Sequence, residues 1–143
     1  MPIGTHRFRC FTPADQAKIW AALTDGQETG RYLHGLFAHS SWLADAPIHF
    51  RTTLSQAAGH TLLTGRVLHV QPFCRLSYLL QSGPKDPPVY LTWQIRSCPG
   101  GSTVQLQIDE VEFADTDEEA ENTWLPVLAA LQNLLAQDET APP

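Results

Sequence analysis

The sequence predicts an α+β domain in which a curved antiparallel β-sheet wraps around a long C-terminal helix, with two short helices between the first and second strands. Three observations support this prediction. Residues 36–113 alternate between apolar and polar side chains, as in strands with one face in solvent. Residues 12–35 carry helix signals, and residues 116–137 carry a broad apolar stripe at helical spacing. Such a stripe must be buried, and the apolar face of the sheet can bury it.

The length and composition of the chain predict a single domain. It has 143 residues, of which 43% are hydrophobic and 17% charged, as is typical of a globular protein with a substantial core. We expect the domain to span residues 1–143, with a folded core at about residues 5–137 and a frayed tail at residues 138–143.

The first elements are indicated by alternation and by capping residues. Residues 3–11 alternate and predict the first strand. Thr12 is a good N-cap for a following helix. Asp25, with Glu28 three residues later, predicts a second, short helix that ends before Gly35. The apolar face of the first helix consists of Ile19, Trp20 and Leu23.

Six further strands are predicted, separated by turn-forming residues. They cover residues 36–43, 47–53, 61–70, 75–82, 88–97 and 102–113. In the last strand the apolar phase slips by one residue after Ile108, which predicts a β-bulge near Asp109 and Glu110. The strand at residues 61–70 is compatible with two phases, so either Leu68 or His69 faces the apolar side.

The final helix begins at a capping box formed by Thr116 and Glu119. Pro126 either kinks this helix or restarts it, because proline removes a backbone donor. The apolar stripe consists of Trp124, Val127, Leu128, Leu131, Leu134 and Leu135. We expect these side chains to lie on the concave side of the sheet.

Three stretches resemble a known family. They are GRVLHVQPFCRLSYLL at 65–80, VYLTWQIRSCPGGSTVQLQIDEVE at 89–112 and WLPVLAALQNLLA at 124–136. The first resembles a Gly-x-Val strand that passes through a proline turn into an Arg-Leu-x-Tyr/Trp strand. The second resembles the next two strands with their glycine turn, and the third resembles the C-terminal helix. These are features of the Hsp90 ATPase activator (AHSA1)-like domains of the SRPBCC superfamily, which is also called START-like or Bet v 1-like.

The resemblance implies a helix-grip fold with a deep, mostly apolar cavity between the sheet and the last helix. Members of the superfamily bind lipids, sterols, polyketides or plant hormones, or act as cyclases and hydrolases, and others interact with Hsp90. Large aromatic residues on the elements around such a cavity suit a flat organic ligand, although they could equally fill the core. The residues expected to line the cavity are Trp42, Phe50, His69, Tyr78, Leu80, Leu91, Trp93, Trp124, Leu128 and Leu131.

Charge and motifs argue against several other classes of protein. A net charge of −6 disfavours binding to nucleic acids and to anionic membranes, and no stretch reaches the roughly 18 apolar residues of a membrane span. The six histidines have no metal-ligand spacing, and nucleotide-binding and nucleophile motifs are absent. We therefore expect no metal, no cofactor and no catalytic residues. Three widely spaced cysteines predict a reduced, cytoplasmic protein.

These observations favour a non-catalytic protein, a monomer or homodimer, that holds a small apolar or aromatic ligand. The alternative is an enzyme of the polyketide cyclase or hydrolase type that uses the same cavity, and a second alternative is a co-factor of an Hsp90-type chaperone. Eight of the fifteen acidic residues lie at positions 109–121, which indicates a solvated helix N-terminus or, alternatively, a contact surface for a basic partner.

Overall fold

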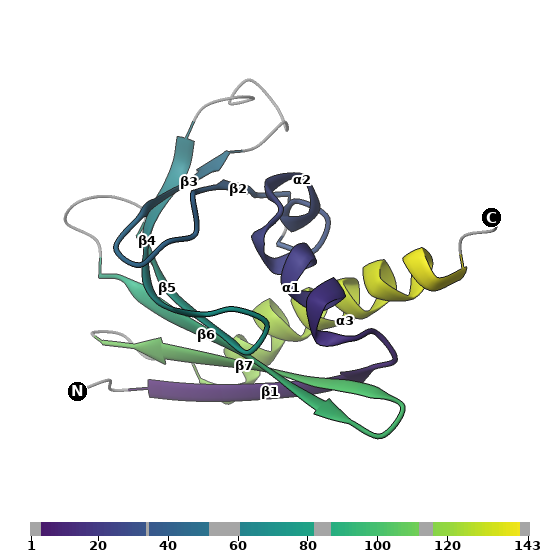
Figure 1. Ribbon diagram of the computed structural model, residues 1–143. Helices are drawn as coiled ribbons and strands as arrows, with labels where there is room; N and C mark the ends of the chain where they lie inside the picture. Colours follow the sequence, from purple (N-terminus) through teal and green to yellow (C-terminus); the bar gives the residue numbers. More distant parts are fainter. Residues whose placement is uncertain (1–3, 34, 52–60, 82–86, 112–115, 141–143) are drawn as a thin grey trace.

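The computed structural model describes residues 4–33, 35–51, 61–81, 87–111 and 116–140. Seven strands and three helices follow one another in the order that the sequence predicts (Figure 1). They are β1 (Gly4–Thr12), α1 (Gln16–Thr24), α2 (Gly26–Thr29), β2 (Phe37–His39), β3 (Pro47–Arg51), β4 (Thr61–Gln71), β5 (Arg75–Gln81), β6 (Val89–Cys98), β7 (Gly101–Glu110) and α3 (Asp117–Thr140).

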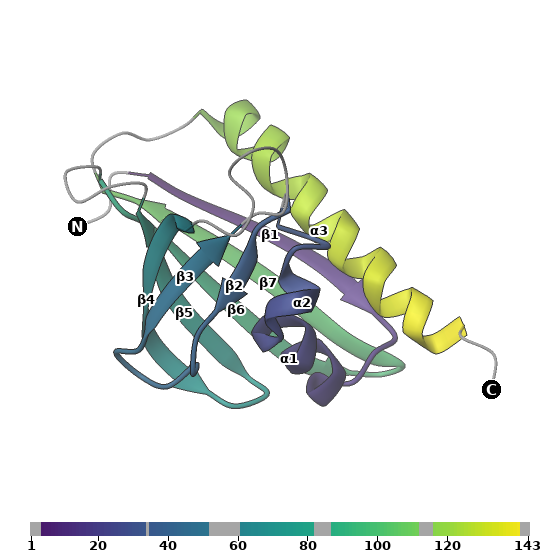
Figure 2. The same ribbon diagram turned by 90° about the horizontal axis from the view of Figure 1, so that it is seen from above.

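The strands form one antiparallel sheet in the order β1-β7-β6-β5-β4-β3-β2. The sheet is strongly curved, and the three helices lie on its concave side (Figure 1). Seen from above, α3 runs alongside β1 for most of its length, and α1 and α2 lie beside it over the same face (Figure 2). The predicted α+β architecture, a curved sheet around a long C-terminal helix, is confirmed.

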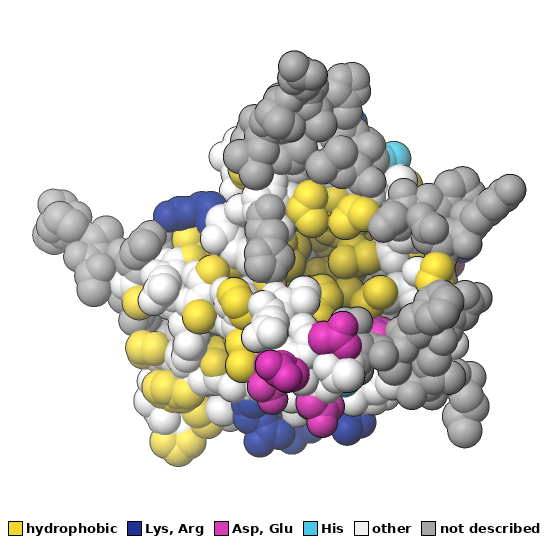
Figure 3. Space-filling model, turned by 180° about the vertical axis from the view of Figure 1, so that it is seen from behind, with side chains coloured by type: hydrophobic (Ala, Val, Ile, Leu, Met, Phe, Trp, Pro, Cys, Tyr) yellow, Lys and Arg dark blue, Asp and Glu magenta, His cyan; other side chains and the backbone are white. Residues whose placement is uncertain are grey.

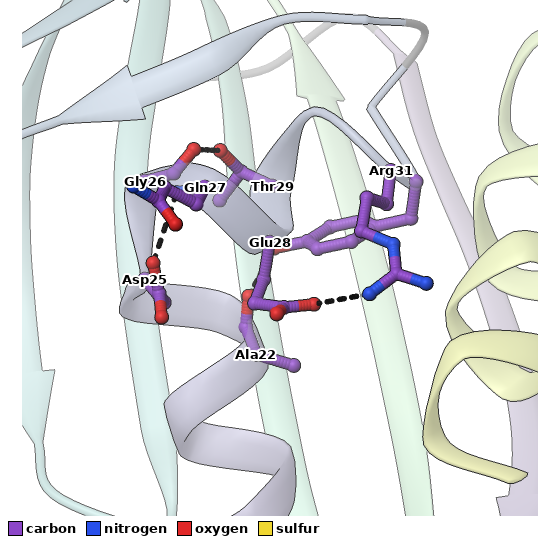
Figure 4. Close-up of polar contacts among 8 residues, drawn as sticks. Ala22, Asp25, Gly26, Gln27, Glu28, Thr29 and Arg31 are labelled. Atoms are coloured by element: carbon purple, nitrogen blue, oxygen red, sulfur yellow. Dashed lines mark hydrogen bonds and ion pairs between the residues drawn. The ribbon is translucent and has the colours of Figure 1, made fainter. Parts of the chain in front are cut away.

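The two short helices are fixed by aspartate caps. α1 is capped by Asp15, whose carboxylate accepts a hydrogen bond from the backbone N–H of Lys18 at 2.8 Å. The predicted cap, Thr12, is wrong because strand pairing with β7 continues through this residue. The predicted cap of α2 is confirmed, since Asp25 accepts from the backbone N–H of Gln27 at 2.9 Å (Figure 4).

The end of β2 and the position of the sheet's bulges differ from expectation. β2 covers only residues 37–39 rather than 36–43, and Trp42 adopts a left-handed backbone angle, with φ of 58°, that a strand cannot accommodate. The bulge predicted near residues 109 and 110 is wrong, since β7 pairs in continuous register with β1 and β6 up to Glu110. Irregularities occur instead at Val67–His69 and Phe50–Arg51.

The C-terminal helix α3 is built as the sequence predicts. In its capping box the Thr116 N–H donates to Glu119 Oε1 at 2.9 Å, and the Glu119 N–H donates to Thr116 Oγ1 at 3.2 Å. The helix continues through Pro126. Its stripe faces the sheet, and the buried side chains are Val127, Leu128, Leu131, Leu134 and Leu135. No helix in the described part of the chain is long and apolar enough to span a membrane.

Candidate functional site

Aromatic side chains gather on the concave face of the sheet, beneath the helices. The rings of Tyr32 and Trp93 meet edge to face with centroids 6.1 Å apart. Tyr78 lies between Trp42 and Phe50, at centroid distances of 6.2 and 6.3 Å. Rings at these separations attract one another through their quadrupoles in addition to the apolar area that they bury. The centre of the domain is therefore an aromatic cluster of five rings drawn from β3, β5, β6 and two connecting segments.

Two hydrogen bonds join polar groups of this cluster to described acceptors. The Trp93 Nε1–H donates to the Tyr78 hydroxyl oxygen at 3.1 Å, and the Tyr32 hydroxyl donates to the carbonyl oxygen of Ala22 at 3.1 Å. The Tyr78 hydroxyl itself donates to none of the residues that the structure describes. Burial raises the pKa of Tyr78 to about 12 and the pKa of Tyr32 well above 10. Both hydroxyls therefore keep their protons at neutral pH.

Nine of the ten residues predicted to line a cavity come together on this face. Six are buried in one continuous core, and three are partly buried against it. The buried ones are Phe50, Tyr78, Leu91, Trp93, Leu128 and Leu131, and the partly buried ones are Trp42, Leu80 and Trp124. Sheet and helix both contribute to this core. That these residues enclose a ligand stays a prediction.

His69, the tenth residue, is wrong as a cavity residue. The bulge in β4 places two residues opposite one on β5, because Val67 pairs with Tyr78 and His69 with Ser77. Leu68 is the extra residue, and both Leu68 and His69 are exposed on the outer face of the sheet. Neither of the two phases considered for this strand is therefore correct, since Val67 alone of these three side chains points inward. A pocket of about 480 Å³ lies beside them on the outer face.

Two titratable side chains point inward at one end of the sheet, and the sequence interpretation had assigned neither to the interior. The side chain of His6 on β1 is 8% exposed, and Glu110 on β7 is 6% exposed. They lie on adjacent strands, since His6 pairs with Ile108 and Gly4 with Glu110. The signal for Glu110 was its position in the inward phase of β7, two residues beyond Ile108.

The imidazole of His6 has one engaged and one unengaged nitrogen. Its Nδ1 lies 3.3 Å from the carboxylate oxygen Oδ1 of Asp117, in the first turn of α3. Its Nε2 is buried and has no hydrogen-bond partner among the residues that the structure describes. When the proton is on Nδ1, where Asp117 accepts it, Nε2 is a buried hydrogen-bond acceptor. A buried polar atom without a partner is costly, so this nitrogen is a candidate contact for a bound group.

The described residues contain no group of three or more His, Cys, Asp or Glu side chains placed to hold a metal ion. The three cysteines are free and partly buried. Burial raises the pKa of the Cys10 thiol to about 11, so this cysteine is largely protonated at neutral pH. Its chemistry is that of a packed core residue rather than of a nucleophile.

The apolar interior reaches the surface in one view of the molecule. Figure 3 shows, from behind, a hollow lined with hydrophobic side chains, and acidic side chains gather below it. The first turn of α3 is itself acidic, with Asp117, Glu118 and Glu119. An apolar hollow with a polar rim has the general make-up of a ligand entrance.

The chain matches a known protein family over most of its length. The model of the activator of Hsp90 ATPase homolog 1-like proteins matches residues 13–136. The chain belongs to this family. The AHSA1-like resemblance seen in the sequence is therefore confirmed, and the match includes every element from α1 to most of α3. No curated protein matches the chain.

Several solved structures share the fold of this chain. ChR145 from Cytophaga hutchinsonii is 19% identical, with a TM-score of 0.76 and 99% of each chain covered. MLL2253 from Mesorhizobium loti is 20% identical, with a TM-score of 0.73, 96% of this chain and 99% of the other covered. DynU16, a protein from the dynemicin biosynthetic locus, is 19% identical with a TM-score of 0.70; 94% of this chain aligns with 48% of DynU16. At these identities the likeness establishes the fold.

Proposed function

We propose that the protein binds a small, flat, mostly apolar ligand between the sheet and α3, without chemical change to the ligand. The observation that carries the proposal is the buried Tyr78 hydroxyl, which keeps its proton and has no described acceptor amid four other rings. The hydroxyl oxygen satisfies the buried Trp93 indole N–H by accepting its hydrogen bond, but the hydroxyl proton has no acceptor among the described residues. A ligand oxygen that accepts this proton would satisfy it.

The chemistry of the cluster specifies what the ligand should look like. Aromatic walls favour a planar unsaturated skeleton through stacking and edge contacts, and the Tyr78 hydroxyl favours a carbonyl, phenol or ether oxygen on that skeleton. The presence of DynU16, from a biosynthetic locus, among the structural neighbours is consistent with a natural product of this kind. We place the binding activity in the cytoplasm, in keeping with three free cysteines.

Native mass spectrometry and solvent extraction of the purified protein test for a co-purifying molecule. A thermal-shift panel of planar aromatic ketones and phenols tests binding directly. For a compound that raises the melting temperature, Tyr78→Phe should weaken the binding affinity about 10-fold. This is the value of one good hydrogen bond to a buried group. Tyr90→Phe is the matched control, because Tyr90 lies on the outer face.

Two results would count against ligand binding. One is a protein that purifies without any small molecule and shows no thermal shift with any compound of the panel. The other is an equal loss of affinity in Tyr78→Phe and Tyr90→Phe, which would mean that the compound does not contact the inner cluster. A loss confined to Tyr78→Phe supports the proposal.

The second candidate function, a cyclase or hydrolase of the polyketide type, is favoured by the His6 geometry. The Nδ1–Asp117 contact orients the ring, and the buried Nε2 is an acceptor that could remove a proton from a bound substrate. Incubation of a bound compound with wild-type protein, His6→Gln and the exposed control His49→Gln, followed by mass spectrometry, tests it. Turnover by wild type and His49→Gln alone would establish the enzyme, and an unaltered compound in all three would favour binding. Action on an Hsp90-type ATPase stays a prediction from the resemblance.

A further inference from the structure

The outer face of the sheet, turned away from α3, collects arginines from distant parts of the chain. Alternation along five strands places there six of the nine Lys and Arg residues, namely Arg7, Arg9, Arg51, Arg66, Arg75 and Arg96. Asp109 is the one carboxylate at an outward position in the described strands, and its oxygens accept from Thr5 Oγ1 at 2.7 Å and Gln107 Nε2 at 2.9 Å. A chain with a net charge of −6 therefore has one basic face.

A pocket of about 270 Å³ lies on this face between Arg9 and Arg96. Its remaining walls are Gln94, Thr103 and Gln105. Strand register explains how they meet, because Arg9 pairs with Gln105, Gln105 with Gln94, and Arg96 with Thr103. Side chains directly opposite one another on adjacent strands have Cβ atoms about 4.5–5.5 Å apart. Three strands thus direct five polar side chains into one small volume.

The hydrogen bonds within the pocket leave it rich in donors. Arg9 donates from Nη2 to Gln105 Oε1 at 3.0 Å, and Gln105 Nε2 donates to Gln94 Oε1 at 3.5 Å. Both amide oxygens are therefore occupied, while the Gln94 amide keeps its N–H groups. The guanidinium of Arg96 and the hydroxyl of Thr103 have no hydrogen-bond partner in the described part of the chain. Two guanidiniums, an amide and a hydroxyl can all donate to the same guest.

We propose that this pocket is a second binding site, which takes a small polyoxyanion of the phosphate-ester or diphosphate class between Arg9 and Arg96. Phosphate oxygens accept hydrogen bonds from several directions at once, and guanidinium groups match them in charge and in geometry. Arg75 pairs with Gln94 on the adjoining strand and adds positive charge beside the pocket. Figure 3 shows Lys and Arg side chains gathered along the lower margin, on the side where β1 and β7 lie in Figure 1.

Isothermal titration of the full chain with sodium pyrophosphate tests this site at low ionic strength, about 20 mM, where screening is weak. We expect saturable binding of one pyrophosphate per chain. Arg96→Gln and Arg9→Gln should each weaken it about 10-fold, which is the loss of one charge-assisted contact. Arg66→Gln is the matched control, since it removes the same charge from the same face outside the pocket, and it should change the affinity by less than about 2-fold.

Three outcomes would overturn the proposal. The first is a titration in which the heat of binding does not saturate up to about 10 mM pyrophosphate. A site of this kind should bind with at least millimolar affinity. The second is an equal loss of affinity in Arg66→Gln and Arg96→Gln. Pyrophosphate binding would then depend on the total charge of the face and not on the pocket. The third is that poly-L-glutamate binds more tightly than pyrophosphate and loses affinity equally in Arg66→Gln and Arg96→Gln. The whole outer face would then be a surface for an acidic protein segment. Arg96→Gln should leave the thermal shift by an aromatic compound unchanged, so this site and the inner site can fail independently.

Discussion

Replacement of Leu131 by alanine tests whether packing on the sheet holds α3 in place. Leu131 is 0% exposed at the middle of the helix stripe, whereas Leu125 on the same helix is 47% exposed. The substitution removes three carbon atoms, worth about 2.4 kcal/mol at about 0.8 kcal/mol each, and the cavity that remains raises the cost to about 3–4 kcal/mol. Leu125→Ala removes the same atoms from a half-exposed side chain and should cost about 0.5 kcal/mol.

Urea unfolding followed by tryptophan fluorescence measures both variants. Leu131→Ala should lower the unfolding free energy with little change in the slope against urea, and should lower the melting temperature by about 10 °C, at roughly 2–4 °C per kcal/mol for a domain of this size. Equal stabilities of Leu131→Ala and Leu125→Ala would refute the reasoning, because the stripe would then make no differential contact with the sheet.

Three further predictions concern single side chains. The backbone N–H of Thr116 donates a hydrogen bond that lowers the pKa of Glu119 below its ordinary 4.5. The ionised carboxylate therefore stabilises the fold above that pH, and this stabilisation is lost as the pH falls. Glu119→Gln should flatten the decline of the urea midpoint between about pH 5 and pH 3. A methyl group at Gly65 would overlap the backbone oxygen of Leu79, so Gly65→Ala should cost about 1–3 kcal/mol in the urea assay, and a cost near zero would contradict the close approach. Because burial raises the pKa of Cys10 to about 11, iodoacetamide at about pH 8 should label it at least 10-fold more slowly in the native protein than in urea, as measured by peptide mass spectrometry.

The sheet was predictable because each of its strands has one apolar face and one polar face. In β6 the inward residues Leu91, Trp93 and Ile95 are buried, as the alternation indicates. The helix stripe of α3 was predictable for the same reason, since its spacing leaves one arrangement that buries every member. The periodicity of apolar residues indicates which side of a strand or helix faces the core. With one sheet and one long helix, there are few ways to pack these apolar faces against each other.

The errors arose where a polar residue occupied an inward position or an apolar one faced out. Glu110 continues the inward phase of β7, but the apolar residues Val111 and Phe113 in the opposite phase of the sequence had indicated a slipped register. Leu68 faces solvent because the bulge in β4 inserts it as an extra residue. Local sequence cannot resolve either case, because a bulge depends on pairing with β5, and the burial of Glu110 depends on what covers the end of the sheet.

The basic outer face was hidden from sequence reasoning for a different reason. Arg9 and Arg96 are 87 positions apart, and the pocket between them exists only because β7 pairs with both β1 and β6. The net charge of −6 is an average over the chain and says nothing about how strand pairing distributes charge. The same average disfavoured long polyanions such as nucleic acids as partners, which is compatible with a pocket for a small anion.

The two proposed sites should be energetically independent, because they lie on opposite faces and far apart along the strands. Tyr78 pairs with Leu91 on β6, and Arg96 lies five residues further along that strand, or roughly 17 Å at about 3.4 Å per residue. Sites separated by more than about 10 Å with no shared partner normally show additive effects within about 0.5 kcal/mol. The unfolding free energies of Tyr78→Phe, Arg96→Gln and the double variant should therefore add within that limit, and Tyr78→Phe should leave pyrophosphate affinity unchanged within about 2-fold. A coupling above about 1 kcal/mol would show instead that the two faces of the sheet respond to one another, and a ligand on one face would then regulate the other.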